Sequence, residues 1–476
     1  MKYSKREEVK TMRISEIINI IKRNFLFGIT VVLVLSIIMY IGYFIVYKKK
    51  IGGSKKINKK QLMVVVMFIG YISMVIGVTF LNRSSGIYRS VNLHFLSTYM
   101  EAWNSFNQRN WQFIILNILI FVPIGILLPL MNKRFNNMLC TLFVGLMITV
   151  TIECLQYLTG FGIFDLDDIF NNILGTAIGY SIKMSISEML HKKKNNGLNI
   201  FMYLFPTVVT LVIFIGIFAY YNLREYGNLS FSYNYRVNMR NAEIFTDLEL
   251  SSDKVKVPIY KAPTHNRETA KKFAIDFYEN LNIKLDNFET IDYSDTSIYW
   301  IRGEPSYNIW VNYLDGSYRY SKFSYLDEEK AANVENDVLI KKLKQYGINV
   351  PASATLSSSG TGTYKWTVDM KRKDDSWVNG ILLCTYYRDD EIKYISNNLV
   401  TYKKVKDIEI ISEVEAYEKL KTGKFKLSNL SNNIKTIHIT EVVLDYMLDS
   451  KGFLQPVYSF HTSLNDEETI IVIPVM

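Results

Sequence analysis

The chain has 476 residues, of which 49% are hydrophobic, and its formal net charge is +10. This charge is divided unevenly: residues 1–221 hold 23 Lys and Arg against 9 Asp and Glu, whereas residues 222–476 hold 32 against 36. Because the basic excess belongs to the apolar first part alone, we interpret it as loop charge that orients membrane helices. It does not indicate a protein that binds nucleic acid.

Six apolar runs in the first part are candidates for membrane helices, since a bilayer core requires about 20 apolar residues per helix. The runs are Phe25–Tyr47, Leu62–Leu81, Trp111–Leu130, Met138–Leu158, Ile169–Ser187 and Ile200–Tyr221. The fifth is the weakest, because two asparagines and a lysine interrupt it. We predict an α-helical integral membrane domain of about six transmembrane helices. Residues 1–24 are predicted to form a basic tail. The first helix and its basic loop occupy residues 25–61, and the last helix occupies residues 191–221.

Basic residues in short loops orient membrane helices, because such loops stay in the cytoplasm. Lysines follow the first run, Lys133 and Arg134 follow the third, and three lysines at 192–194 follow the fifth. The loop 159–168 contains three aspartates and no basic residue. This alternation places that loop and the whole of 222–476 outside the cytoplasm. The tail also carries seven basic residues on the side assigned to the exterior, so its own side stays open.

From Asn222 onward the composition is that of a soluble domain. Residues 222–266 show little periodicity and are predicted to form a stalk. Helices are predicted at Arg267–Leu281, 331–346 and 412–423, the last with a capping box in Ser412 and Glu415. Strands are predicted at Ser297–Arg302, Tyr307–Tyr313, Tyr318–Tyr325, Tyr364–Met370, Ile381–Tyr387, Lys435–Tyr446, Gln455–His461 and Thr469–Val475. Residues 267–476 are therefore predicted to be an extracellular α+β domain.

The second half offers few candidates for chemistry. Its histidines have no metal-ligand spacing, and no nucleophile lies beside a base. Its clustered Tyr and Trp residues either pack the sheet or line a binding face, packing being the commoner role. The last 65 residues or so, with 412–421, 452–460 and Ile473-Pro474, resemble the extracytoplasmic regulatory proteins of the YycH/YycI type. This resemblance implies a module that modulates envelope signalling.

Three polar motifs lie in the apolar part, where ionisable residues cost roughly 2.5–3.5 kcal/mol each and are usually functional. The first comprises Asn117, Pro123 and Gly125, and the second comprises Glu153 and Gln156. The third comprises Asp165, Asp167, Asp168, Asn172, Gly175 and Gly179. This ordered set resembles the VanZ-like family, over a domain that we place at residues 62–190.

The resemblance implies a membrane protein of the bacterial cell envelope. Such a protein would lower the access of glycopeptide or lipoglycopeptide antibiotics, teicoplanin among them, to the cell surface. Many relatives carry an arginine just ahead of the aspartates, whereas residues 159–168 contain none. If that arginine binds an anionic group, this chain lacks the contact. Together with the heavy use of Lys, Asn, Ile and Tyr, typical of AT-rich genomes, the resemblance points to a Gram-positive bacterium.

The spacing of the motif residues predicts one polar pocket. Glu153 and Gln156 share a helix face, and Asp168 stands where the next helix begins, with Asn172 one turn further on. We predict that the fourth and fifth helices form an antiparallel pair with these side chains at its outer end. The pocket is predicted to contain Glu153, Gln156, Asp165, Asp167, Asp168 and Asn172. The remaining residues, Asn117, Pro123, Gly125, Gly175 and Gly179, are assigned to helix packing.

Three roles remain open for this pocket: capping and cross-helix hydrogen bonds, a site for a ligand or lipid headgroup, and general acid–base catalysis. No nucleophile or phosphate-binding loop supports catalysis, so we do not predict an enzyme, and we expect no metal or cofactor. The expected partners are the lipid bilayer, a cell-wall precursor or lipid headgroup, and another envelope membrane protein. The alternative function is an envelope sensor or regulator, whose extracellular domain binds a ligand or partner.

Overall fold

The structure is a computed structural model that describes residues 14–41, 43, 49, 58–81, 90–190, 197–230, 239–324, 330–358, 360–373, 375–423, 425 and 434–476. The chain divides into two compact units: a helical unit, built mainly within Met12–Glu225, and a sheet unit, built mainly from Tyr226–Met476. Most of the predicted basic tail and the lysines at 192–194 lie outside the described residues.

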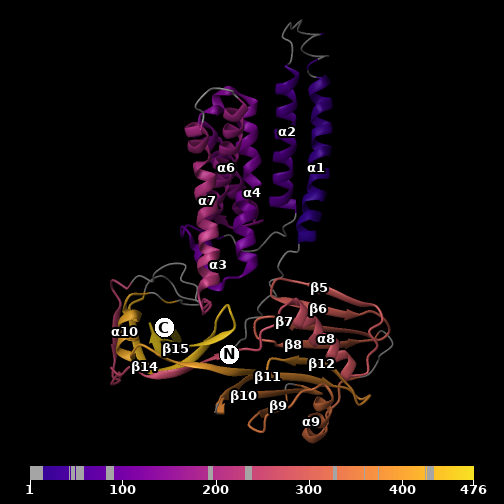
Figure 1. Cartoon of the computed structure of the whole chain (residues 1–476), viewed down its shortest axis with the longest axis vertical. Helices are drawn as coiled ribbons and strands as arrows, with labels where there is room; N and C mark the ends of the chain where they lie inside the picture. Colours follow the sequence, from indigo (N-terminus) through magenta and orange to yellow (C-terminus); the bar gives the residue numbers. More distant parts are fainter. Residues whose placement is uncertain are drawn as a thin grey trace. The chain divides into compact units, whose positions relative to one another are not determined.

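The helical unit contains seven α-helices in its described residues. They are α1 (Ile14–Ile41), α2 (Lys59–Ile76), α3 (Ser97–Ser105), α4 (Gln108–Met131), α5 (Met138–Thr159), α6 (Leu166–Leu190) and α7 (Gly197–Leu223). Shorter elements are the π-helix η2 (Gly77–Leu81), the 3-10 helix η3 (Lys133–Asn136) and a parallel pair of strands, β1 (Val91–Asn92) and β2 (Phe164–Asp165). Figure 1 shows α1 beside α2, and α4, α6 and α7 side by side.

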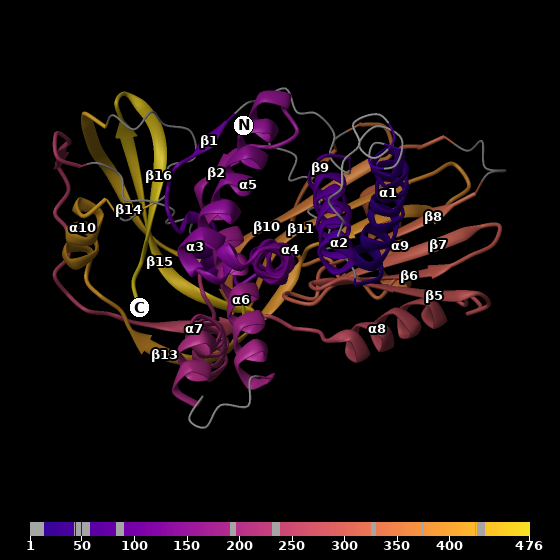
Figure 2. The same ribbon diagram turned by 90° about the horizontal axis from the view of Figure 1, so that it is seen from above.

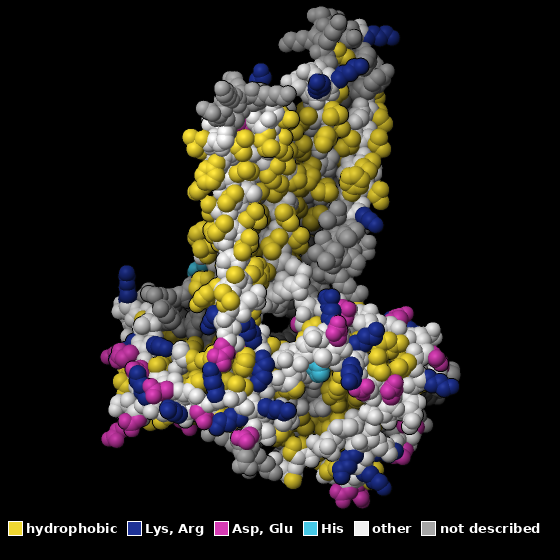
Figure 3. Space-filling model, viewed as in Figure 1, with side chains coloured by type: hydrophobic (Ala, Val, Ile, Leu, Met, Phe, Trp, Pro, Cys, Tyr) yellow, Lys and Arg dark blue, Asp and Glu magenta, His cyan; other side chains and the backbone are white. Residues whose placement is uncertain are grey.

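Four of the described helices, α2, α4, α5 and α7, are long and apolar enough to cross a membrane. Each of the six predicted runs overlaps a helix, but α1 carries only a shorter apolar stretch, Gly28–Ile38, and polar residues interrupt α6. Apolar side chains cover the visible face of these helices (Figure 3). On α7, Phe201 and Leu211 are more than half exposed. Such a surface suits lipid, where the helix backbone is satisfied internally.

Glycines create the closest helix contact of this unit, between α4 and α6. A Cβ atom on Gly175 would lie 2.0 Å from the carbonyl oxygen of Ile118, and one on Gly179 would lie 1.9 Å from that of Val122. In the other direction, a Cβ on Gly125 would lie 2.0 Å from a backbone oxygen of α6. Only hydrogen fits at these positions, so the two backbones touch.

The glycine stripe on α6 was predicted to admit a neighbouring helix, and the structure identifies that helix as α4. The prediction paired the fourth and fifth apolar runs, α5 and α6, and this pairing is only the secondary contact. It includes the packing of Thr176 against Gly145. A stripe of small residues indicates close approach but not the partner. Pro123 lies inside α4 without ending it.

The sheet unit combines a mixed sheet with three described helices, α8 (Arg267–Asn280), α9 (Asn336–Gln345) and α10 (Glu413–Lys421). Its first strands are β3 (Glu243–Thr246), β4 (Lys256–Lys261), β5 (Phe288–Asp292), β6 (Thr296–Ile301), β7 (Ser306–Asn312), β8 (Tyr318–Phe323) and β9 (Thr355–Ser358). The others are β10 (Thr363–Lys373), β11 (Ser376–Tyr386), β12 (Ile392–Asn397), β13 (Val400–Glu409), β14 (Thr436–Leu448), β15 (Phe453–Leu464) and β16 (Glu467–Pro474). The main strand order is β3-β14-β15-β4-β13-β11-β12-β8-β7-β6-β5.

Two cores hold the helices against this sheet. Ala270 and Phe277 of α8 pack in a cluster that includes Tyr299 and Tyr320. A second cluster joins Ala416 and Leu420 of α10 to strands β14, β15 and β16. Figure 2 shows α8 beside β5 and α10 beside β14. Each helix contributes both small and large side chains, such as Ala270 with Phe277 and Ala416 with Leu420, which fill the space between the layers.

The three predicted helices and the three groups of antiparallel strands are confirmed in this unit, including the capping box of Ser412 and Glu415. The predicted stalk, in contrast, is wrong over 243–261, which forms β3 and β4. Strand β4 lies between β13 and β15, with Ile259 and Tyr260 buried. Strand β15 pairs only with Tyr260 and Lys261, at the far end of β4. Pro258, which has no N–H to donate, is therefore tolerated, because it is aligned with β13 alone.

Candidate functional site

The candidate site surrounds the start of α6, where Asp165 receives hydrogen bonds from two segments. Its Oδ1 accepts from the backbone N–H of Asp167 at 2.9 Å, and its Oδ2 accepts from Nδ2 of Asn92 at 3.1 Å. The pair β1–β2 sets this contact, because it aligns Asn92 with Asp165. Asp165 therefore caps α6, a role that the sequence assigned to Asp168.

Asp167 is fully buried and caps the neighbouring helix α3. Its carboxylate accepts from the backbone N–H of Leu96 at 2.6 Å, from that of Thr98 at 2.8 Å and from the hydroxyl of Ser97 at 3.3 Å. A carboxylate at a helix N-terminus is favoured by the unpaired N–H groups and the helix dipole. One aspartate of α6 thus orders a second helix far away in sequence.

Asp168, Asn171 and Asn172 extend the cluster to three other helices. Asn117 of α4 donates its side-chain amide to Asp168, and the hydroxyl of Tyr99 on α3 donates to Oδ1 of Asn171. Nδ2 of Asn172 donates to the hydroxyl of Thr149 on α5 at 2.8 Å. Two of the buried amide atoms that find no partner in the described structure lie in this cluster: Nδ2 of Asn171 and Oδ1 of Asn172.

The motif on α5 joins the same region at its own helix end. Glu153 is 2% exposed, and its Oε2 accepts from the backbone N–H of Asp165 at 3.2 Å. Gln156, also buried, turns toward η2 and donates to the carbonyl oxygen of Thr79 at 3.4 Å. Glu153 therefore belongs to the aspartate cluster, whereas Gln156 joins α5 to η2.

Burial changes the acid–base behaviour of two groups outside the long apolar helices, Asp165 in β2 and Tyr99 in α3. It raises the pKa of Asp165, although hydrogen bonds from the N–H of Asp167 and from Asn92 oppose the rise. Burial also raises the pKa of Tyr99, and the charges of Asp167 and Asp168 add to the effect. Tyr99 consequently stays protonated and able to donate. The donors found for Asp165 and Asp167 are all neutral groups, so burial of these two carboxylates is offset by hydrogen bonds.

The structure brings Glu153, Asp165, Asp167, Asp168 and Asn172 into one region and adds members that the sequence did not indicate. The added residues are Asn92, Leu96, Ser97, Thr98, Tyr99, Thr149 and Asn171. Most of them belong to residues 92–99, before α4, which lie between the second and third predicted runs. Asn117 was assigned to helix packing, and its side chain contacts the cluster directly.

A model of the VanZ/LLP1 family matches residues 61–187, which include the whole cluster. Residues 61–187 are a VanZ-like domain. Protein VanZ of Enterococcus faecium is similar to this chain, with 28% identity over 103 residues. That match covers 22% of this chain and 63% of the length of the relative. The family model ends before α7, so the resemblance of the last 65 residues to YycH/YycI-type proteins stays a prediction.

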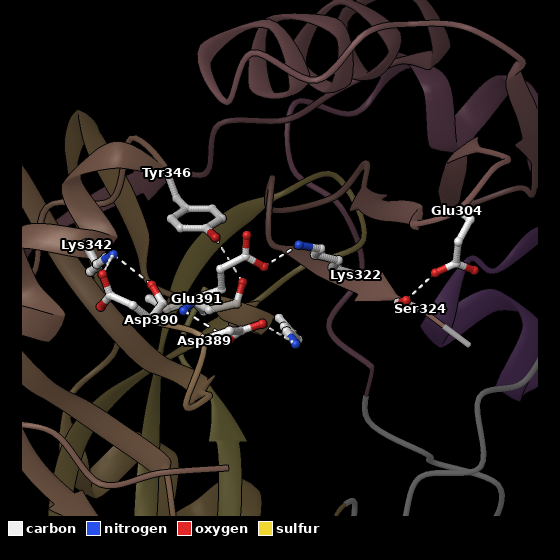
Figure 4. A network of polar contacts seen from close by, with 10 residues as sticks. Glu304, Lys322, Ser324, Lys342, Tyr346, Asp389, Asp390 and Glu391 are labelled. Carbon is white, nitrogen blue, oxygen red and sulfur yellow. Dashed lines mark hydrogen bonds and ion pairs between the residues drawn. The ribbon is translucent and has the colours of Figure 1, made fainter. Parts of the chain in front are cut away.

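A second polar cluster lies outside the VanZ-like domain, at the turn between β11 and β12 (Figure 4). Lys342 forms an ion pair with Asp390 at 2.6 Å, and Lys393 forms one with Asp389 at 2.5 Å. Lys322 pairs with Glu391. The bond from Lys342 lowers the pKa of Asp390. These paired charges hold the turn against α9 and β8, which is a structural role.

Proposed function

We propose that the protein is a VanZ-like membrane protein of the bacterial cell envelope that alters susceptibility to glycopeptide or lipoglycopeptide antibiotics, with teicoplanin as the first to test. The observation that carries the proposal is the match of residues 61–187 to the VanZ/LLP1 family, in which the buried carboxylate cluster lies. The similarity to Protein VanZ of Enterococcus faecium supports it.

The carboxylate cluster is the part of the domain that we propose to contact a polar ligand. Two buried amide atoms there, Nδ2 of Asn171 and Oδ1 of Asn172, have no partner. An unsatisfied buried polar group costs about 1–3 kcal/mol. A hydroxyl or amide of a lipid headgroup or cell-wall precursor that reached these atoms would recover that cost. Such recognition requires hydrogen bonding and no covalent chemistry.

We propose that the cluster and the sheet unit lie outside the cytoplasm. Support comes from the two ends of α5: Lys133 and Arg134 lie in η3 before its start, and the aspartates follow its end. A helix of 22 residues is about 33 Å long, which separates these charges by the thickness of a bilayer core. Basic residues mark the cytoplasmic side. Labelling of a cysteine introduced at Ile163 by an impermeant reagent tests this topology, and protection of that cysteine in intact cells would refute it.

The functional test compares teicoplanin susceptibility, and labelling by fluorescent teicoplanin, among cells with equal amounts of each variant in the membrane. The variants are wild type, Asp168→Asn, Asn171→Leu and the truncation 1–221. Glu188→Gln is the matched control, because it also neutralises a carboxylate of α6 but lies near the other end of that helix. We expect wild type, the truncation and the control to protect, and the two cluster variants to lose protection.

Other outcomes separate the proposal from its alternative. Equal susceptibility of cells with wild type and cells without the protein would refute the antibiotic function. If wild type protects and the truncation does not, the sheet unit takes part, which favours a sensor or regulator anchored by the helices. If the cluster variants protect as well as wild type, the cluster has only a structural role.

A further inference from the structure

The sheet unit carries a cationic and aromatic patch close to the point where the chain leaves α7. The patch consists of Tyr226, Lys261, Lys403, Lys406, Lys451 and Phe453. It lies outside the VanZ-like domain, and nothing in the proposed function uses it.

Strand register places the centre of this patch on one face of the sheet. Lys261 of β4 is aligned with Phe453 of β15 on one side and with Lys403 of β13 on the other. Residues aligned across neighbouring strands project from the same face. The side chains agree with the register, because Nζ of Lys261 lies 3.8 Å from the centre of the Phe453 ring. Lys403 is exposed beside them.

The segment that follows α7 completes the patch. The ring of Tyr226 packs edge-on against that of Phe453, with 5.2 Å between ring centres, and Nζ of Lys406 lies 5.3 Å from the Tyr226 ring. The turn between β14 and β15 contributes Lys451, whose carbonyl oxygen accepts a hydrogen bond from Lys261. Cations and aromatic rings therefore alternate across the surface.

Hydrogen bonds fix this segment to the sheet. The backbone N–H of Gly227 donates to the buried carboxylate of Asp449 at 2.7 Å, and Gln455 donates to the carbonyl oxygen of Gly227 at 3.0 Å. Asn228 and Ser450 exchange two further bonds, of 2.8 and 2.9 Å. Asp449 is 1% exposed and accepts several hydrogen bonds, and its charge also acts on the nearby Lys261.

Chain connectivity keeps Tyr226, at one edge of the patch, close to the end of α7. The apolar helix α7 ends at Leu223, only three residues before Tyr226, and three residues span at most about 11 Å. Lys and aromatic side chains are the residues that membrane interfaces favour. An anionic leaflet attracts lysines that lie within a Debye length, about 8 Å at physiological salt.

We propose that this patch docks on the anionic phospholipid headgroups of the membrane that α7 crosses. The sheet unit then rests against the lipid surface through its lysines, with the half-buried Phe453 ring at headgroup level. The nearby Lys404 contributes little, because it is paired with Asp407 at 3.0 Å.

The test measures the acetylation rates of individual lysines, by peptide mass spectrometry, on the full chain in nanodiscs. Discs of phosphatidylcholine alone are compared with discs that also contain phosphatidylglycerol. We expect Lys403 and Lys406 to react several-fold more slowly in the anionic discs, and 1 M salt to abolish the difference. The internal controls are Lys271 and Lys272, exposed on α8, whose rates should not depend on the lipid.

A double variant checks that the patch acts as a unit. In Lys403→Gln/Lys406→Gln, the lipid-dependent protection of Lys451 should disappear, whereas Lys271→Gln/Lys272→Gln should retain it. Equal rates for the patch lysines in both kinds of disc would overturn the proposal, as would equal changes at the control lysines. Protection by soluble glycerol phosphate in phosphatidylcholine discs would also overturn it, in favour of a site for free phosphate.

Discussion

The two units of this protein are packed by opposite means. In the helical unit, α4 and α6 meet where side chains are missing, at Gly125, Gly175 and Gly179. In the sheet unit, large rings such as Trp366 and Tyr320 are almost completely buried between helices and strands. The difference follows from the solvent: lipid gives no hydrophobic drive to join apolar helices, so they associate through close backbone contact, whereas water drives aromatic side chains inward.

Polar groups differ in the same way. The helical unit buries the carboxylates of Glu153 and Asp167 and satisfies them with hydrogen bonds from other segments. The sheet unit also buries a carboxylate, that of Asp449, but its ion pair Arg302–Glu289 is largely exposed and contributes little, about 0–1 kcal/mol. Stability of the helical unit should therefore respond most to added atoms and lost hydrogen bonds, and stability of the sheet unit to lost rings.

The largest effect is expected from Gly179→Leu. The new side chain would occupy the position of the Val122 carbonyl oxygen, so α4 and α6 would have to separate. We expect the helical unit to lose its folded state in detergent, as measured by thermal aggregation and size-exclusion chromatography. Gly216→Ala is the control, because a Cβ there meets nothing within 4 Å. Similar melting temperatures for both variants would show that the close contact between α4 and α6 does not stabilise the helical unit.

The next effect is expected from Trp366→Ala in the sheet unit. Trp366 is 1% exposed, and removal of a buried tryptophan side chain costs about 3–5 kcal/mol. Hydrogen exchange of β10 and β11 measures the loss. Phe323→Ala removes a ring that is 51% exposed and should cost far less. If the two variants lost equal protection, the aromatic core would not be the source of stability.

A smaller effect is expected from Asp167→Asn. The amide keeps one acceptor but presents N–H groups to a second donor, so a charged hydrogen bond worth about 1.5–3 kcal/mol is lost at the start of α3. Faster hydrogen exchange over 96–102 is the expected result. The same change on α6 at Glu188 should leave this segment unchanged, and unaltered exchange in the Asp167 variant would refute the capping role.

The smallest effect is expected from Ser412→Ala, which removes the N-cap of α10 at a cost of about 1 kcal/mol. Two hydrogen bonds lower the pKa of Glu415: the capping bond from the N–H of Ser412, which has the larger effect, and the bond from Lys254. A lowered pKa means that the ionised cap stabilises α10 at neutral pH, and that this contribution fades as the pH falls through the acidic range. Protection factors from hydrogen exchange of 413–421 at two pH values measure both effects, and protection that does not change with pH would contradict the second.

The success of prediction differed among the elements of the sheet unit. The helix Arg267–Asn280 carries a clear 3.6-residue period, the helix Glu413–Lys421 carries a capping box, and these local signals sufficed. Strand β4 was not predicted, because its short run contains Pro258 and a proline usually indicates a loop. Only its position between β13 and β15 makes it a strand.

The motif residues of the site were visible in the sequence, but their partners were not. Asp167 caps a helix about 70 residues earlier in the chain, and the glycine stripe of α6 faces α4 rather than the helix next to it in sequence. Such contacts depend on the arrangement of the helices in space, which no local pattern contains.

The position of β4 also determines when the sheet unit can be completed. This strand is made early, but its two neighbours begin at Val400 and Phe453. At about 5–20 residues per second, the second neighbour follows the end of β4 by roughly 10–40 s of synthesis. Until β13 is made the nascent strand has two open edges, and until β15 is made it still has one, each able to pair with another chain. A chaperone that holds this strand would therefore protect the protein most while it is being made.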